Sequence, residues 1–343
     1  MKPEMIQHLC AEPIGRFPVW AMRQAGRYLP QYRAIRSKYS FWEMATQPEV
    51  AAEVSLTPLA AGLPVDGIIF FSDILTLPYG MGIPITIEEK VGPVATTPLR
   101  TLSDFAVFEK FSAEQHTPFV GQALQKISAS IPVKMAVLGF AGAPWTVACY
   151  LTEGKSGKKF EAIRNWMHRD PKDLTQALSF LSDATACYLE AQIDAGAHLV
   201  QVFDTWLSEM PKAFFVEFYQ PLLNSLFRKL RQKRVPVIYF SKRAHHLLEE
   251  FQNLEMDILS ADELLSLGEI EKRTAARFAL QGNLDPLLLF SDTGTVRQKT
   301  RLLVQQARAL QRPALLNLGH GILPGTPVEN VRAFMEEARQ SWV

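Results

Sequence analysis

The sequence has few of the residues that mark a secreted or zinc-binding protein. Its 343 residues include only three cysteines, Cys10, Cys149 and Cys187, and these lie far apart. Their number and spacing fit neither a disulfide framework nor a zinc site, and they indicate a reducing compartment. The N-terminal segment lacks a long apolar stretch and carries Glu4 and Glu12. We therefore predict no secretory signal and a cytoplasmic location.

The sequence also lacks an excess of charge of either sign. Its 36 basic and 35 acidic residues leave a net charge of +1, which favours neither nucleic acid nor an anionic membrane as a partner. The most apolar long window, residues 50–71, contains Glu53, Asp66 and two prolines, so we do not expect it to cross a membrane. Any anion must therefore be bound by a local cluster of positive charges.

No Gly/Ser-rich linker, low-complexity tract or internal repeat divides the chain, which predicts one domain over residues 1–343. Short β-rich apolar runs alternate with longer segments of helical periodicity. The eight runs that we predict as strands are Pro18–Met22, Val65–Phe71, Val133–Gly139, His198–Phe203, Val235–Phe240, Met256–Ser260, Phe278–Gln281 and Ala314–Leu318. Unbroken apolar strands alternating with helices indicate the α/β class and a parallel sheet covered by helices. A single (β/α)8 TIM-type barrel closes eight such units, and a doubly wound open sheet is the alternative.

Three segments carry apolar residues at helical spacing, and one connection has a different character. The first stripe lies between Pro171 and Gly196, which are typical of a helix start and a helix end. The three stripes are Leu174, Leu178, Leu181, Thr185, Tyr188 and Leu189; Tyr219, Leu222, Leu223 and Leu226; and Val296, Leu302, Leu303 and Ala307. Residues 72–100 are instead rich in Gly, Pro and Thr, which predicts a β-hairpin inserted after the second strand.

Near the N-terminus, the stretch PVWAMRQAGRYLP leaves an apolar run and places Arg23 and Arg27 around Gly26. No acidic residue lies between Met22 and Pro30, so the two positive charges have no local partner in the sequence. If this segment is helical, the spacing of four residues puts both arginines on one face. The pattern favours a site for an anion over an ordinary solvated surface.

Other reactive side chains follow the predicted strands, where a barrel of this kind carries its chemistry. They are Asp73, Tyr150, Asp204, Thr205 and His320. Each has a plainer interpretation. An aspartate after a strand is often a helix cap, a tyrosine is often half-buried packing, and Asp204 and Trp206 can simply fix the rim. The glycines on both sides of His320 either let the imidazole approach a ligand or make a turn.

Six segments together resemble the uroporphyrinogen decarboxylase family. They are PVWAMRQAGRYLPQYR, FFSDIL, GFAGAPWTVACYL, QVFDTW, ALQGNLDP and NLGHGILPGTPVENV, in the family's order from residue 18 to about residue 331. The resemblance implies a homodimeric barrel without metal or organic cofactor. Its substrate would be uroporphyrinogen, whose four acetate side chains lose carbon dioxide to give coproporphyrinogen, a step of haem biosynthesis.

The resemblance also implies roles for individual residues. Substrate-binding residues would be Arg23, Gln24, Ala25, Gly26, Arg27, Asp73, Tyr150, Thr205 and His320, and of these Asp73, Arg23 and Arg27 would be catalytic. Asp73 would accept the pyrrole N–H groups, and the arginines would bind carboxylates as planar forks. The proton donor stays open between an arginine, which is a poor general acid, and His320, whose pKa is better matched in principle.

Two departures from the family pattern and two rival functions complete the prediction. Thr205 stands where the family commonly has serine, and Glu263 stands where a tryptophan is expected after Asp262. A corrinoid-linked methyltransferase on the same barrel would need zinc held by His and Cys in the C-terminal half, yet the last cysteine is Cys187. A non-catalytic tetrapyrrole carrier would keep the arginines and have no use for Asp73.

Overall fold

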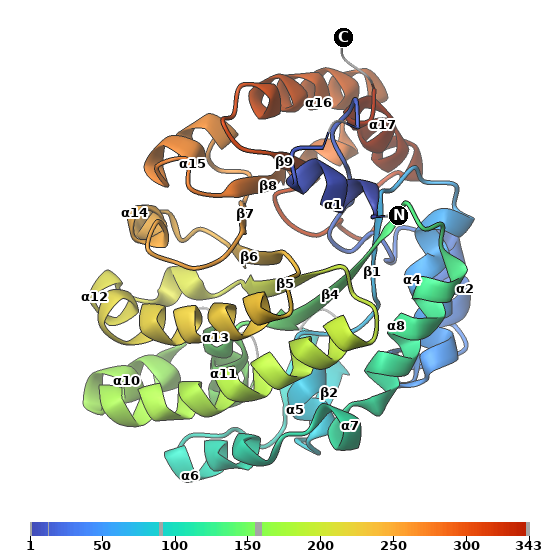
Figure 1. Cartoon of the computed structure of the whole chain (residues 1–343). Helices are drawn as coiled ribbons and strands as arrows, with labels where there is room; N and C mark the ends of the chain where they lie inside the picture. The colour runs from blue at the N-terminus through green and yellow to red at the C-terminus, as the bar shows by residue number, and fades with distance from the viewer. Residues whose placement is uncertain (1, 13, 89–91, 155–159, 341–343) are drawn as a thin grey trace.

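The computed structural model describes residues 2–12, 14–88, 92–154 and 160–340, and its main feature is a curled parallel sheet surrounded by helices (Figure 1). Seven strands pair in the order β1-β4-β5-β6-β7-β8-β9, and every pair is parallel. These strands are β1 (Gly67–Ile69), β4 (Ala136–Gly142), β5 (Leu199–Asp204), β6 (Val237–Ser241), β7 (Ile258–Ser260), β8 (Ala279–Leu284) and β9 (Ala314–Leu318). Nearly all their residues are buried, as expected for strands covered by helices on the outside.

The N-terminal segment closes the sheet into a barrel. Val19 forms a parallel bridge with Leu316 of β9, and its carbonyl accepts the N–H of Asp66, which directly precedes β1 (2.8 Å). Trp20 joins the inside of the barrel, where its indole N–H donates to Gln281 (2.9 Å). The predicted (β/α)8 TIM-type barrel is confirmed, with residues 18–20 in the place of one strand.

This closing segment is shorter than the predicted strand Pro18–Met22, because side chains take most of its N–H groups. Pro18 has no N–H, and the N–H of Val19 donates to the Asp66 carboxylate (2.8 Å). The N–H groups of Ala21 and Met22 donate to side-chain oxygens of Gln24 and Asn317 (both 3.1 Å). Few groups are left for a neighbouring strand, so only a bridge forms.

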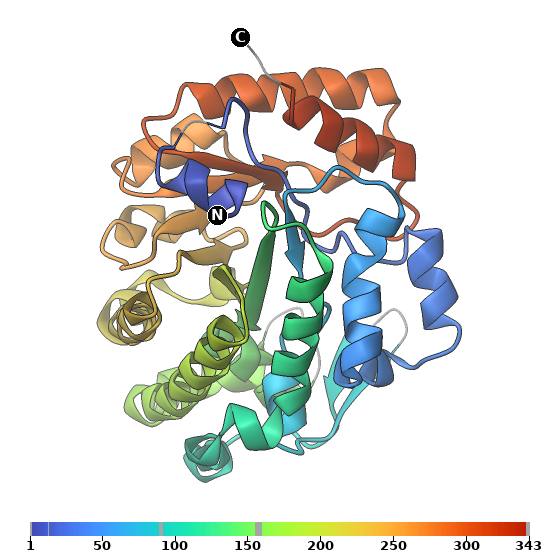
Figure 2. The ribbon, with the colours of Figure 1, turned by 45° about the vertical axis from the view of Figure 1, so that its right-hand side comes forward.

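Helices cover the outside of the barrel, and Figure 2 shows them from a second side. The α-helices are α1 (Glu4–Leu9), α2 (Pro30–Arg36), α3 (Phe41–Thr46), α4 (Pro48–Ala60), α5 (Thr76–Gly80), α6 (Leu102–Phe105), α7 (Ala113–His116), α8 (Pro118–Ser130), α9 (Pro144–Glu153), α10 (Glu161–Arg169), α11 (Pro171–Asp194), α12 (Lys212–Phe214), α13 (Gln220–Gln232), α14 (Leu248–Phe251), α15 (Leu267–Arg273), α16 (Thr293–Arg308) and α17 (Val328–Ala338). Four 3₁₀ turns, η1 (Ala106–Lys110), η2 (Leu207–Glu209), η4 (His245–Leu247) and η5 (Pro286–Phe290), and one π turn, η3 (Phe215–Tyr219), adjoin them. None of these helices is long and apolar enough to cross a membrane.

Between β1 and β4 the chain leaves the barrel. It forms α5 and then a two-stranded antiparallel sheet of β2 (Ile85–Glu88) and β3 (Gly92–Ala95), paired from Ile85 with Ala95 to Glu88 with Gly92. Residues 89–91, which connect the two strands, lie outside the described residues. The inserted segment thus contains a helix in addition to the paired strands that the sequence pattern predicts.

Two side chains that the sequence analysis placed inside a strand or a buried stripe are exposed. Val133 is 67% exposed, because residues 133–135 form a turn and the strand begins at Ala136. Leu302 is 44% exposed on α16, whereas Leu303 next to it is buried. The stripe from Leu174 to Leu189 on α11 is buried throughout, as predicted.

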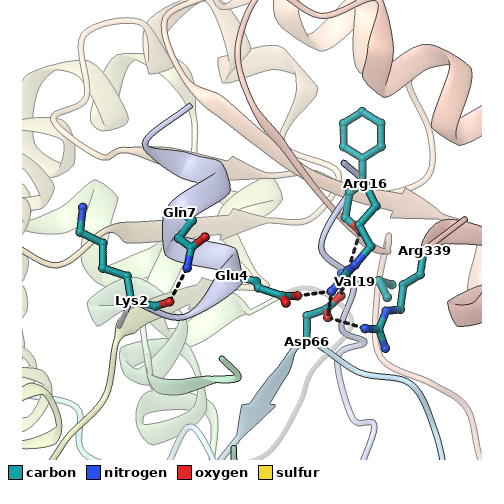
Figure 3. A network of polar contacts seen from close by, with 8 residues as sticks. Lys2, Glu4, Gln7, Arg16, Val19, Asp66 and Arg339 are labelled. Atoms are coloured by element: carbon teal, nitrogen blue, oxygen red, sulfur yellow. Dashed lines mark hydrogen bonds and ion pairs between the residues drawn. The ribbon is translucent and has the colours of Figure 1, made fainter. Parts of the chain in front are cut away.

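Figure 3 shows a charged cluster at the amino ends of the strands. The Arg16 guanidinium donates to both carboxylate oxygens of Asp66 (2.7 Å each) and also to Glu4 of α1. Arg339, just after α17, lies 3.3 Å from Asp66. The cluster therefore ties both terminal segments to the place where the barrel closes.

Candidate active site

The predicted site residues come together at the carboxyl ends of the strands. Asp73 follows β1, Tyr150 lies on α9 after β4, Thr205 follows β5, and His320 follows β9. The segment of Arg23 and Arg27 leaves the closing segment at the same end. Parallel strands all point their carboxyl ends the same way, so residues far apart in the sequence share one mouth.

Residues 21–29 form turns, and the next helix, α2, begins only at Pro30. The conditional prediction that Arg23 and Arg27 share a helix face is therefore wrong. Arg23 has φ +61°, and a Cβ on Gly26 would lie 2.8 Å from the Arg23 carbonyl oxygen. The turn is tight enough to need glycine at residue 26, and it leaves both arginine side chains exposed.

Gln24 holds this turn in place. Its side chain is fully buried, its oxygen accepts the N–H of Ala21 (3.1 Å), and its nitrogen donates to the Gly67 carbonyl (2.9 Å). The Tyr28 hydroxyl donates to the Gln24 carbonyl (2.8 Å). The predicted substrate contact of Gln24 therefore has no free side chain to make it, while Ala25 and Gly26 stay partly exposed.

The Arg23 side chain extends toward the loop after β9. A Cβ on Gly321 would lie 2.4 Å from Arg23 Cδ and 2.9 Å from its Nε, so the arginine stem crosses the glycine backbone. Its charge also acts on His320 and on Asp73, lowering the pKa of each. Arg23 thus lies between the predicted imidazole and the predicted carboxylate.

Asp73 is both a helix-start residue and a charge in the mouth. Its Oδ1 accepts the N–H of Leu75 (2.8 Å), and its own N–H donates to the hydroxyl of Thr76 at the start of α5 (3.1 Å). Burial raises the pKa of the Asp73 carboxyl, and the Leu75 N–H and the Arg23 charge oppose that rise. A positively charged ligand beside it would favour the ionised form.

Tyr150 extends the site on the side of α9. Burial and the nearby Asp73 charge raise the pKa of its hydroxyl to about 12, so the phenol stays protonated and can donate. Its ring packs edge-on against Trp206, with centroids 6.1 Å apart. Tyr150 is therefore a packing residue whose hydroxyl is kept in its donor form.

Asp204 is the last residue of β5, and Thr205 is the first residue of the turn that follows. Asp204 is fully buried and accepts hydroxyl groups from Thr146 (2.6 Å), Tyr219 (2.8 Å) and Tyr239 (2.8 Å). Burial raises the pKa of its carboxyl to about 6, and these hydroxyls oppose the rise. Asp204 thus fixes the rim, and Thr205 next to it is half-buried.

His320 is neutral in this environment. Burial, together with the positive charges of Lys242 and Arg23, lowers the pKa of its imidazole to about 3. Its ring stacks on Phe240 at 5.9 Å and 25°. Neutral His320 can exchange hydrogen bonds with a ligand at neutral pH, but it is not an imidazolium that could act as a general acid.

Sequence reasoning missed a row of phenylalanines that lines the mouth. Phe70, Phe140, Phe203 and Phe240 follow each other around β1, β4, β5 and β6, with neighbouring centroids 5.0, 5.6 and 5.6 Å apart. Tilted and edge-on contacts of this kind are the favourable arrangement for aromatic rings. The only signal in the sequence is that each strand carries a phenylalanine near its carboxyl end.

A third cation at the mouth, Lys242, was also missed. It follows β6 directly and is half-buried, and burial lowers the pKa of its ammonium group, as do the charges of Arg243 and Arg23. Its position two residues after the predicted strand Val235–Phe240 was the signal that could have found it.

Fold and site together define a TIM-barrel protein whose mouth combines cations, a buried carboxylate and an aromatic lining. The sequence matches the family described as uroporphyrinogen decarboxylase (URO-D) over residues 2–341. Relatives named uroporphyrinogen decarboxylase are 39% identical in Prochlorococcus marinus (strain MIT 9211), over 98% of this chain and 96% of the relative, and 39% identical in Gloeobacter violaceus (strain ATCC 29082 / PCC 7421), over 96% and 94%. The chain belongs to the uroporphyrinogen decarboxylase family.

Solved structures agree on the fold. A methyltransferase from Methanosarcina mazei superposes with a TM-score of 0.79 over 98% of this chain and 97% of that one, at 20% identity. A protein titled putative vitamin-B12 independent methionine synthase from Listeria monocytogenes gives a TM-score of 0.55 at 12% identity, over 94% and 95%. At these identities the likeness concerns the barrel alone.

Proposed function

We propose that the protein is a carboxy-lyase that decarboxylates the four acetate side chains of uroporphyrinogen III to methyl groups, giving coproporphyrinogen III in tetrapyrrole biosynthesis. Family membership over nearly the whole chain supports the substrate. The observation that carries the chemistry is Asp73, a carboxylate with a burial-raised pKa in a mouth lined by phenylalanines and cations.

The reaction needs an electron sink, because loss of carbon dioxide from an acetate leaves a pair of electrons on carbon. Many decarboxylases take the sink from a cofactor. A pyrrole can supply its own when a ring carbon is protonated, since the ring then carries a positive charge that accepts the electrons. The enzyme must favour this cation over the neutral ring.

Asp73 has the character that this step requires. An ionised carboxylate in a partly dry site attracts a cationic ring more strongly than it would in water. Because burial raises the pKa of the Asp73 carboxyl, formation of the ring cation beside it and ionisation of Asp73 favour each other. Its free acceptor positions suit the pyrrole N–H groups.

The other residues bind and orient the substrate. Arg23 and Arg27 are exposed, and their planar forks bind carboxylates in pairs of hydrogen bonds. Tyr150 and Thr205 offer hydroxyl groups, and neutral His320 offers an imidazole hydrogen bond. The phenylalanines give the macrocycle an apolar surface. With its pKa at about 3, His320 is the weaker candidate for the acid that protonates the ring.

The test is anaerobic incubation of the purified protein with uroporphyrinogen III, followed by oxidation and separation of the products by carboxyl number. We expect seven-, six-, five- and four-carboxyl porphyrins. Recovery of only the eight-carboxyl species, bound to the protein, would favour a tetrapyrrole carrier. Failure to bind it at all would contradict the assignment of the mouth.

A corrinoid-linked methyltransferase is the rival on the same fold. Its zinc would need a cluster of His and Cys side chains, and no group of three His, Cys, Asp or Glu residues is placed to hold a metal in the described parts of the chain. Cys149 is buried, and burial raises the pKa of its thiol. The product assay separates the two functions, because only a decarboxylase releases carbon dioxide.

We further propose that the protein works as a single-domain homodimer in the cytoplasm, without metal or organic cofactor. The resemblance of the sequence to its family supports this proposal. Light scattering after gel filtration tests the dimer, and full turnover after treatment with a chelator and dialysis tests the absence of a cofactor.

A further inference from the structure

Lys242 follows a strand on the side of the barrel opposite the segment that carries the arginines, and the Arg23 side chain extends far enough for its charge to act on Lys242. Seven strands and the closing segment form a ring of eight, and β6 is four places from the closing segment in that ring. Ser241, the last residue of β6, pairs with Asp204 of β5, so Lys242 is level with Thr205. Cations therefore flank the mouth from two sides.

The charge of Lys242 lies near the ring of His320. Phe240, two residues before Lys242 and still within β6, stacks its ring on that of His320. The charge of Lys242 acts on His320 and lowers the pKa of its imidazole. Within the described part of the chain, Lys242 forms no ion pair.

Asp262 holds the backbone around Lys242. Its carboxylate is 3% exposed, and it accepts the N–H of Arg243 as well as the N–H of Leu264 (3.1 Å). It also contacts His245 Nε2 at 3.0 Å. A buried acceptor thus joins the loops after β6 and β7 and fixes the residue next to Lys242.

Glu263, the next residue, supplies a negative charge beside this lysine. A Cβ on Gly319 would lie 2.5 Å from Glu263 Oε2, so the carboxylate lies against the glycine that precedes His320. Oε2 is buried and accepts no hydrogen bond from any described residue, which is a costly state for a carboxylate oxygen. Its charge acts on Lys242 and raises the lysine pKa, against the effect of burial.

We propose that Lys242 binds a carboxylate of the substrate from the side opposite Arg23 and Arg27, and that Glu263 competes with that carboxylate for the lysine. The inference rests on the proposed function, because it concerns the same mouth. A macrocycle with eight carboxylates around its edge needs cations on more than one side. Glu263 weakens binding of the anion, and so it also eases release of the product.

Four single substitutions test the inference, with KM and kcat measured for uroporphyrinogen III. Lys242→Gln removes one charge-assisted contact, so we expect KM to rise roughly 10-fold with kcat within about two-fold. Lys242→Arg should restore most of the loss. Glu263→Gln removes the competing charge, so KM should fall, by about three-fold. Arg243→Gln is the matched control, because it removes a neighbouring positive charge whose side chain is exposed.

An unchanged KM in Lys242→Gln would overturn the inference, and so would an equal rise in Arg243→Gln, which would show a general field instead of a contact. A rise of KM in Glu263→Gln would overturn the role of that residue. Thermal unfolding checks that each variant is folded. The affinity for uroporphyrin III, the oxidised form of the substrate, ranks the same variants without turnover. Quenching of tryptophan fluorescence measures this binding. If the variants rank in the expected order for porphyrin binding but the wild-type protein does not decarboxylate uroporphyrinogen III, the proposed function is contradicted. The role of Lys242 in binding is then still supported.

Discussion

The two ends of the barrel contain the same kinds of charged side chain and use them differently. At the amino end, Arg16 donates to both oxygens of Asp66 at 2.7 Å, and both side chains are largely buried (Figure 3). At the carboxyl end, Arg23 forms no ion pair with any described residue, and Asp73 accepts a backbone N–H. At the amino end the charged side chains pair with each other, whereas at the mouth Arg23 and Asp73 remain able to bind a ligand.

This difference separates stability from binding. A buried pair with two parallel hydrogen bonds holds its surroundings in one geometry, and loss of either partner leaves a buried charge alone. Asp73, a carboxylate without an ion-pair partner among the described residues and with a pKa that burial raises, contributes little to stability. Its charge is available to the ligand instead. Substitutions at the two ends should therefore affect different measurements.

The largest expected effect is on catalysis at the mouth. Asp73→Asn removes the charge that favours the cationic ring, so kcat should fall roughly 10³-fold, as for other strong electrostatic contacts to a transition state. The free energy of unfolding should stay the same or rise, because a buried carboxyl is replaced by a neutral amide. Single-turnover rates and urea unfolding measure the two quantities. Unchanged turnover would contradict the assigned mechanism.

The counterpart at the amino end is Asp66→Asn. It removes the carboxylate that binds Arg16 through two hydrogen bonds and leaves Glu4 as the remaining carboxylate partner, so the free energy of unfolding should fall by up to about 3 kcal/mol. Urea unfolding measures this loss, and kcat of the folded protein should not change. Asp183→Asn is the control, because Asp183 pairs with Lys229 on the surface (2.6 Å) and such pairs contribute little. Equal losses in both variants would mean that burial of the Arg16 pair is unimportant.

A smaller effect concerns the pH dependence of kcat/KM. Activity requires ionised Asp73, so it should fall as the pH drops through the pKa of that carboxyl. Arg23 stabilises the ionised form, and Arg23→Gln should therefore raise this pKa and move the acid limb to higher pH. Arg27→Gln is the matched control, because the Arg27 charge acts on Tyr32 instead. Arg27→Gln should raise KM without shifting the acid limb of the pH profile. The same shift in both variants would contradict the placement of Arg23.

The smallest expected effect comes from Gly321→Ala. The new methyl group would meet the flexible stem of Arg23, which can move aside, so stability should change by less than about 0.5 kcal/mol. The displaced guanidinium should bind substrate less well, with KM raised about three-fold. Gly268→Ala, with open space around its Cβ, is the control. An unaltered KM in Gly321→Ala would show that the path of the Arg23 stem does not matter.

Most of the barrel could be predicted from the sequence, because buried parallel strands are nearly continuous apolar runs. The first strand was overestimated because Asp66, Gln24 and Asn317 take N–H groups that a regular strand would use, and two of these partners, Asp66 and Asn317, are distant in sequence. The third strand was predicted to begin at Val133, three residues too early, because a β-branched residue beside a proline also occurs in turns. The pattern of hydrophobic residues does not show which backbone N–H groups donate to side chains.

Reasoning from the sequence placed the candidate site residues at one end of the barrel, where the structure has them. It did not predict their local surroundings. Placing Asp73 and His320 at one end needed only the rule that the strands point their carboxyl ends the same way. The neutrality of His320 could not be predicted, because it depends on burial and on two cations from other elements. The buried role of Gln24 was hidden too, since its acceptor, the Gly67 carbonyl, belongs to another strand.

The closure of the barrel also sets the order in which the protein can acquire its site during synthesis. Val19 needs Leu316 as its neighbour, and the Arg23 stem crosses Gly321, so both wait until residues 316–321 have been synthesised. Contacts between such distant residues form late and slowly. A nascent chain that ends before β9 therefore has most of its strands but lacks the neighbours of Val19 and of the Arg23 stem.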